Sequence, residues 1–278
     1  MKMIMSDHKS KNKETHNKMF YNLLQSQRAE KAQLAIFVII AIILVASVAL
    51  VFVFFNQDFG FLRQAENPVK DIEHCLENDL EEIVNEISIH GGRYDPEEGY
   101  ILYEKQRINY LCYTDDYDEK CVSREPVLSG RVKKEIIDQI SGKVDACFAS
   151  LGRRLQDYEE EATELDVEII PNKLILKINK KIYFTENEQN KNLENFNIGI
   201  RSPMFGFISL ATEMVNQELS CDCPKTSCNA DILRLAMRNR EFEIDRFVTG
   251  RNEEIYTIEE ALSGKRFRFA VRNCIRDV

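Results

Sequence analysis

The longest apolar run of the chain covers residues 34–55 and contains one polar side chain, Ser47. At about 1.5 Å of rise per residue, a helix of this length would cross a hydrocarbon core of about 30 Å. Core helices have shorter apolar runs, and a cleavable secretory signal has a shorter leader and a shorter apolar core. The pattern therefore predicts a transmembrane helix over residues 33–57, with the lipid bilayer as its partner.

The charges on either side of this run predict its orientation. Residues 1–32 carry seven basic and three acidic side chains, a net charge of +4, and the next basic residues are Arg63 and Lys70. Basic residues are retained on the cytoplasmic side of a membrane. We therefore expect a cytoplasmic tail over residues 1–32, a stalk over 58–66 and an acidic extracytoplasmic domain over 67–278.

Two stretches of this domain have the three- and four-residue apolar spacing of amphipathic helices. The first begins at Asn67-Pro68, an N-cap residue followed by proline at the first helical position, and ends at Gly91-Gly92. The second covers residues 129–151. Cys75 and Cys147 lie near the apolar sides of these helices, so we expect a disulfide between them.

From residue 165 onward, apolar and polar residues mostly alternate, which is the pattern of half-buried strands. Residues 165–169 and 174–178 flank the turn Pro171-Asn172 and predict a hairpin. Residues 185–192 read as a polar linker, a further helix is predicted over 203–219, and short strands are predicted at 196–200, 242–244, 255–258 and 267–271. We therefore expect an α+β fold: an N-terminal transmembrane helix, then two amphipathic helices and mostly antiparallel sheet.

All eight cysteines follow the apolar run: Cys75, Cys112, Cys121, Cys147, Cys221, Cys223, Cys228 and Cys274. An even number of cysteines on the predicted outer side is typical of disulfide bonds in an oxidising compartment. Cys112 and Cys121 form a second expected pair. The last four cysteines allow three connectivities.

The segment CDCPKTSC, residues 221–228, has two further interpretations. Its cysteines and Cys274 could supply four thiolates to zinc, but structural zinc sites usually show paired C-x2-C spacings. A thiol-exchange site is the other alternative. Acidic residues 115–119 could bind calcium weakly, although they lack the spacing of an EF-hand loop. Structural disulfides are the favoured interpretation, so we expect no metal and no cofactor.

Composition excludes some classes of function. The formal net charge is −9 at pH 7, without the basic patch that nucleic-acid binding requires. The chain has four histidines and neither an H-E-x-x-H nor a G-x-S-x-G motif. The sequence therefore predicts a protein that binds no nucleic acid and is not an enzyme.

The junction Glu30-Lys31-Ala32-Gln33 places charged residues and then a small one directly before the apolar run. It resembles the class III signal peptide of archaeal type IV pilin-like proteins. The resemblance implies cleavage between Ala32 and Gln33, after which the apolar helix could pack into a filament core. Phe37 stands where many pilins carry an acidic residue, and a plain anchor explains the same segment.

Residues 33–37, 71–94 and 254–273 together resemble a family of uncharacterised archaeal single-pass membrane proteins. The shared pattern is an anchor, a Cys-containing helix closed by Gly-Gly, and a final Phe-x-Phe-Ala strand. The resemblance implies an ectodomain of one recurring design and no particular activity. CDCPKTSC departs from the pattern.

These observations favour a non-enzymatic, membrane-anchored cell-surface protein, either a filament subunit or an envelope scaffold. Its partners would be further copies of itself or other envelope proteins. A single-pass receptor with a ligand-binding ectodomain is the second interpretation. An extracytoplasmic thiol oxidoreductase is the third.

Overall fold

The computed structural model describes residues 40–48, 67–223, 240–251 and 253–274. Residues 40–48 are helical and belong to a first compact unit, residues 1–63, and all other described residues belong to a second unit, residues 64–278. Among the described residues, no helix has both the length and the apolar content needed to cross a membrane.

The predicted transmembrane helix, and the single-pass membrane localisation built on it, are therefore wrong. Residues 40–48 of the predicted span are helical. The remainder of the predicted span, the predicted tail over 1–32 and the stalk over 58–66 lie outside the described residues.

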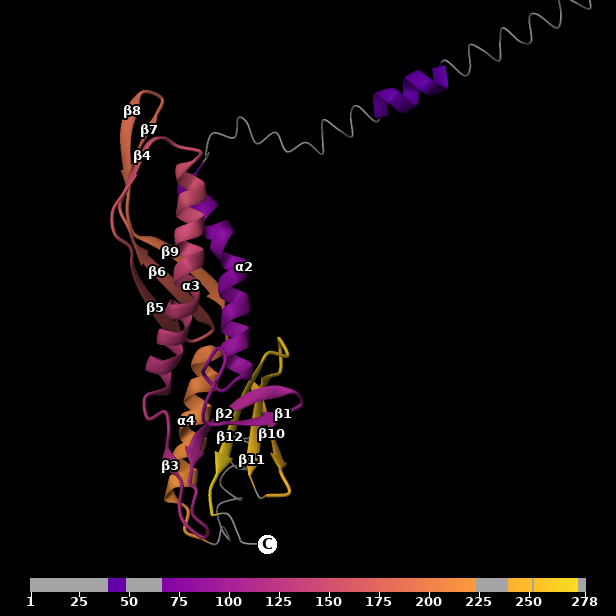
Figure 1. Cartoon of the computed structure of the whole chain (residues 1–278), viewed down its shortest axis with the longest axis vertical. Helices are drawn as coiled ribbons and strands as arrows, with labels where there is room; N and C mark the ends of the chain where they lie inside the picture. The colour runs from indigo at the N-terminus through magenta and orange to yellow at the C-terminus, as the bar shows by residue number, and fades with distance from the viewer. Residues whose placement is uncertain (1–39, 49–66, 224–239, 252, 275–278) are drawn as a thin grey trace, which may run out of the picture. The chain divides into compact units, whose positions relative to one another are not determined.

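Two long antiparallel helices form the middle of the second unit (Figure 1). Helix α2 covers Pro68–Ile89, and Asn67 caps it by accepting hydrogen bonds from the backbone N–H groups of Val69 and Lys70. Helix α3 covers Leu128–Gly152. The chain leaves α2 through Gly92, whose φ of +91° disfavours other residues and where a Cβ would lie 2.8 Å from Leu128. Both amphipathic helices were predicted from their apolar spacing.

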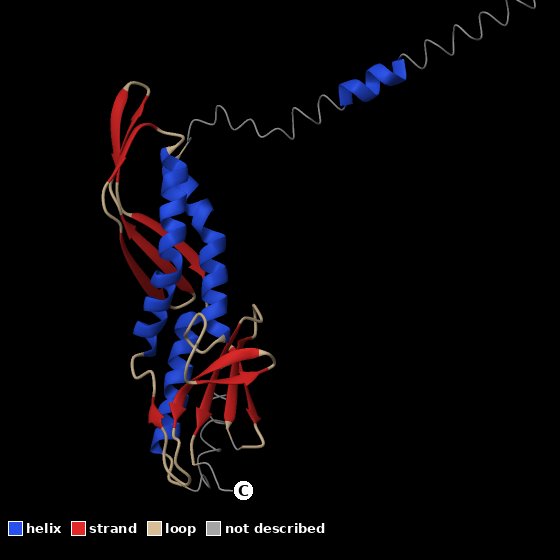
Figure 2. Ribbon diagram, in the orientation of Figure 1, coloured by secondary structure: helices blue, strands red, loops and turns tan. Residues whose placement is uncertain are grey.

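A three-stranded antiparallel sheet packs on this helix pair through β5 and β9 (Figure 2). Its strands are β5, β6 and β9, which cover Glu164–Ile170, Lys173–Asn179 and Phe196–Arg201. Ile170 pairs with Lys173 across the Pro171-Asn172 turn, and Asn172 takes a positive φ. The predicted hairpin is confirmed.

A second three-stranded sheet consists of β4, β7 and β8, which cover Gln156–Glu160, Ile182–Glu186 and Gln189–Leu193. Strands β7 and β8 form a hairpin around Asn187 and Glu188, both with positive φ. The polar linker expected over residues 185–192 is therefore wrong. Its turn lacks glycine, and its second strand is exposed and polar, so neither of the usual hairpin signals is present.

The largest sheet has the strand order β1-β2-β12-β11-β10, with β3 paired to β2. These strands cover Tyr100–Tyr103 (β1), Gln106–Tyr113 (β2), Val122–Ser123 (β3), Phe242–Val248 (β10), Glu254–Glu260 (β11) and Arg266–Arg272 (β12). Strands β2 and β12 are parallel, and the other pairs are antiparallel. The class is α+β as expected, but this sheet is mixed.

Helix α4, Met204–Ser220, contacts this sheet through β2, β3 and β12.

A buried polar network fixes the last turn of α4. The Tyr256 hydroxyl lies 2.9 Å from Glu218 Oε1 and also bonds to Glu254. Asn273 Nδ2 donates to the carbonyl and carboxylate oxygens of Glu218, while its Oδ1 accepts from the backbone N–H of Cys121. One asparagine thus joins α4, β12 and the segment before β3.

Three disulfides lie wholly within the described residues: Cys75–Cys147, Cys112–Cys121 and Cys223–Cys274. The first two are the pairs that the sequence predicted. Cys221 is also disulfide-bonded, and none of the described cysteines is free. Cys228 lies outside the described residues. The disulfide interpretation is confirmed for the seven cysteines that the structure describes.

Replacing both Cys75 and Cys147 by alanine should lower the free energy of unfolding by about 4 kcal/mol, because the bond joins residues 72 apart in sequence and restricts the unfolded chain. The matched pair Cys112→Ala and Cys121→Ala opens a separation of 9 residues and should cost about 3 kcal/mol. Urea unfolding of the full chain measures both. A larger loss from the second pair would contradict this ranking.

Candidate functional site

A β-bulge in β2 decides which side chains reach the outer face of the largest sheet. The register passes from Tyr110 opposite Ala270 to Cys112 opposite Val271, which leaves Leu111 as an extra residue in β2. Leu111 and Cys112 both belong to the main core, whereas Tyr110 and Tyr113 belong to a small cluster on the other face. The bulge thereby places two tyrosines three residues apart on one face.

The largest sheet curls around this small cluster, which contains Ile108, Tyr110, Ile255 and Ala270. Tyr103 on β1 and Phe247 on β10 belong to opposite ends of the strand order, yet their ring centroids are 5.1 Å apart. The two edge strands therefore approach each other across the outer face.

Arginines cover the tyrosines of this face. Arg268 Cζ lies 6.0 Å from the centroid of the Tyr103 ring, and Arg272 and Arg124 lie 5.4 Å and 5.6 Å from that of Tyr113. We call the surface formed by Tyr103, Tyr113, Phe247, Arg124, Arg268 and Arg272 the arginine–tyrosine surface.

Ring contacts offset part of the cost of burying the guanidinium Nε atoms of two of these arginines. The Nε atoms of Arg268 and Arg272 are buried and have no hydrogen-bond partner among the described residues. A guanidinium near an aromatic ring is attracted by the negative charge of the ring face. This attraction offsets part of the lost solvation and keeps the two side chains against the tyrosines.

A buried carboxylate anchors one end of the surface. Glu253 accepts a hydrogen bond of 2.8 Å from the Tyr110 hydroxyl and lies 3.6 Å from Arg272 Nη1. Burial raises the pKa of Tyr110, and the Glu253 hydrogen bond raises it further. Tyr110 therefore stays a neutral donor to Glu253, which in turn faces Arg272.

We expect four tyrosines to ionise later than unfolded tyrosine, whose pKa is about 10. Burial raises the pKa of Tyr110, Tyr158 and Tyr256, and a hydrogen bond to Asp115 raises that of Tyr113. The folded chain then binds more protons than the unfolded chain above pH of about 10, so stability should fall as pH rises past that value.

Phenolate absorbance of the full chain measures this, and Tyr110→Phe should reduce the late part of the titration. Ionisation of every tyrosine in one step near pH of about 10, with the fold intact, would contradict the assignment.

Arg124 is exposed, and no ion pair to it is present within the described ranges. Its neighbour Glu125 forms two ion pairs: Oε1 lies 2.7 Å from Arg93 Nη2, and Oε2 lies 3.0 Å from Arg131 Nε. The Glu125 side chain is 5% exposed. The backbone at Arg124 is therefore held in place while its guanidinium faces solvent.

Glu125→Gln should lower the free energy of unfolding by about 2 kcal/mol, because it leaves Arg93 and Arg131 without the carboxylate that pairs them. Asp138→Asn is the matched control, since its ion pair with Lys134 is exposed and should contribute at most about 0.5 kcal/mol. Equal losses of unfolding free energy in urea for the two variants would show that the ion pairs of Glu125 do not stabilise the fold.

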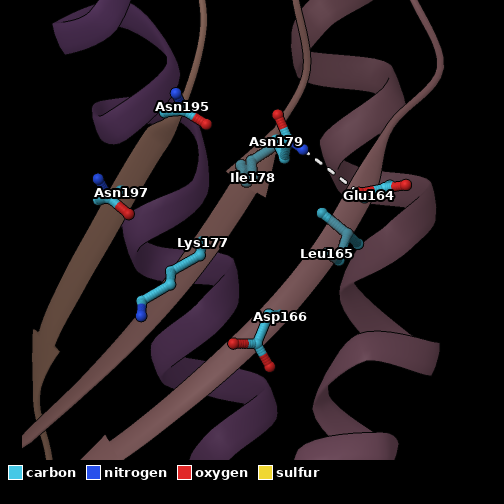
Figure 3. A pocket seen from close by; sticks show the side chains of 8 residues that line it. All are labelled: Glu164, Leu165, Asp166, Lys177, Ile178, Asn179, Asn195 and Asn197. Atoms are coloured by element: carbon cyan, nitrogen blue, oxygen red, sulfur yellow. Dashed lines mark hydrogen bonds between the residues drawn. The ribbon is translucent and has the colours of Figure 1, made fainter.

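A second surface lies on the solvent side of the β5–β6–β9 sheet. It is a shallow depression of about 310 Å³, and Figure 3 shows Lys177 on the central strand between Asp166 and Asn197. Lys177 is 2.8 Å from Glu168, whose hydrogen bond raises the lysine pKa. Glu164 accepts a hydrogen bond from Asn179. The charges pair across strands, as expected of a solvated sheet face.

The other residues singled out from the sequence have the following positions. Ala32 and Gln33 lie outside the described residues, so the processing site stays a prediction. The Asp115 carboxylate accepts a hydrogen bond from Tyr113. Within the described ranges, no three His, Cys, Asp or Glu side chains are grouped to hold a metal ion.

Sequence reasoning missed the arginine–tyrosine surface. Arg268 and Arg272 alternate with the buried residues of β12, which is a detectable signal, but the tyrosines come from β1 and β2, far away in the chain. Without the parallel pairing of β2 with β12, nothing links them.

Comparison with known proteins found no family model that matches this chain, and no similar curated protein or solved structure. The resemblance to a family of uncharacterised archaeal single-pass membrane proteins therefore stays a prediction.

Proposed function

We propose that this protein is a non-enzymatic binding module of an oxidising compartment, and that it contacts a protein partner through the arginine–tyrosine surface. The observation that carries the proposal is the combination of exposed Arg124 and half-exposed Phe247 with stacked tyrosine and arginine side chains. Tyr and Arg are enriched at the energetic centres of protein interfaces, and aromatic residues and Arg are enriched in interfaces generally.

The geometry also keeps the conformational cost of binding low. Arg268 donates to Glu104 and Gln106, both at 3.0 Å, so its guanidinium is already oriented. Tyr113 donates to Asp115 at 2.6 Å. Side chains that are ordered before contact lose less entropy when a partner binds.

The disulfides support the compartment named in the proposal. Structural disulfides persist in oxidising surroundings and are rare in reducing ones. An assembly of identical chains and a complex with a different protein are both compatible with such a surface, and the experiment separates them by mass.

We expect photo-crosslinking in cells of the natural source to capture a protein through this surface. A benzoylphenylalanine at position 247 of the full chain should give one discrete crosslinked product, whereas the same group at position 197, on the solvent side of the β5–β6–β9 sheet, should give none. A product of twice the chain mass identifies self-assembly, and any other mass identifies a different partner.

Arg124→Glu in the position-247 protein should reduce the product at least about tenfold, which corresponds to roughly 1.4 kcal/mol of binding free energy. Lys177→Glu supplies the same change of charge on the control face. Equal yields from positions 247 and 197, or no product from position 247, would refute the proposed binding surface.

A further inference from the structure

The disulfide between α2 and α3 lies in a row of contacts between the two helices. Cys75 is bonded to Cys147. One turn before Cys75, Asp71 pairs with Arg154 at 2.9 Å, and one turn after it, Asp79 pairs with Lys143 at 3.2 Å. The disulfide is thus flanked by an ion pair on each side.

Exposure separates this disulfide from the others. Cys75 is the exposed cysteine among those that the structure describes, while Cys112, Cys121, Cys147 and Cys274 are at most 5% exposed and Cys223 is half-buried. Thiol–disulfide exchange requires an incoming thiolate to reach a sulfur atom, so access selects the site of attack. Cys75 is the residue that offers that access.

The direction of exchange follows from access and not from charge. Lys143 neutralises the Asp79 carboxylate, which would otherwise disfavour the thiolates that attack and leave at this disulfide. Arg154 pairs with Asp71 on the other side in the same way. Because the attacking thiolate reaches Cys75, Cys147 is the leaving group.

We propose that Cys75–Cys147 is a thiol-exchange site, at which a dithiol attacks Cys75. The incoming thiolate forms a bond to Cys75 Sγ, the bond between the two Sγ atoms breaks, and its electron pair leaves with Cys147 Sγ, which takes a proton from water. The second thiol of the reagent then attacks the reagent's first sulfur, which is bonded to Cys75. This forms a disulfide within the reagent and releases Cys75. The dithiol is oxidised to a disulfide, and the protein gains two electrons and two protons.

The helix pair can survive this reduction because its contact does not depend on the bond. Buried apolar side chains run along both helices: Ile72, Leu76, Leu80, Ile83, Val84 and Ile87 on α2, and Val132, Ile136, Ile140, Val144, Phe148 and Leu151 on α3. The two ion pairs also remain. The product is a folded protein with one exposed thiol.

The test uses the full chain and the neutral monothiol 2-mercaptoethanol, followed by iodoacetamide and peptide mass mapping. At limiting reagent, the mixed disulfide should form on Cys75 and the free thiol should appear at Cys147, at least about tenfold ahead of exchange at Cys112–Cys121 and Cys223–Cys274. Circular dichroism should show unchanged helix content after the reaction.

Lys143→Gln should slow the exchange by about threefold without moving it from Cys75, because the Asp79 carboxylate then lacks its cation and disfavours the thiolates of the exchange. Lys134→Gln is the matched control on the same helix, since it removes an exposed ion pair to Asp138 away from the disulfide. Adduct mainly on Cys147, earlier exchange at either other disulfide, or loss of helix on reduction would overturn the proposal. Equal rates for the two lysine variants would overturn the role assigned to Lys143.

Discussion

The apolar contact between α2 and α3 is the constraint on which the other described elements of the second unit depend. The β5–β6–β9 sheet packs on both helices, β12 packs on α2, and α4 packs on α3. Removing this contact would leave the two sheets without a shared core, because their own buried faces point toward the helices. Cys75–Cys147 restrains the same pair, but it lies at the exposed edge of the contact.

The periodicity of the sequence predicted this contact. Both helices have a continuous apolar stripe, and Asn67-Pro68 and Gly91-Gly92 provide local start and stop signals. The Pro171-Asn172 hairpin was predictable for the same reason, since its turn residues and its alternation agree. The cysteine positions near the apolar sides then predicted one disulfide correctly, although Cys75 is exposed.

Other features depend on pairings between distant segments. The bulge at Leu111 exists only because β2 lies parallel to β12, and no local signal in β2 marks it. The β7–β8 turn uses Asn187-Glu188, which resembles a loop in composition. The predicted membrane span rested on hydropathy, and among the described residues no helix has the length and apolar content to cross a membrane.

The core and the arginine–tyrosine surface are linked through consecutive residues at the end of β12. Arg272 faces the surface, Asn273 binds Glu218 and Cys121 in the core, and Cys274 is bonded to Cys223. A displacement of Arg272 would have to strain the Asn273 hydrogen bonds or the disulfide. Because these buried bonds are formed in the unbound fold, Arg272 is ordered before any partner arrives. The cost of ordering it is therefore included in the folding free energy, so it does not reduce the affinity of the surface.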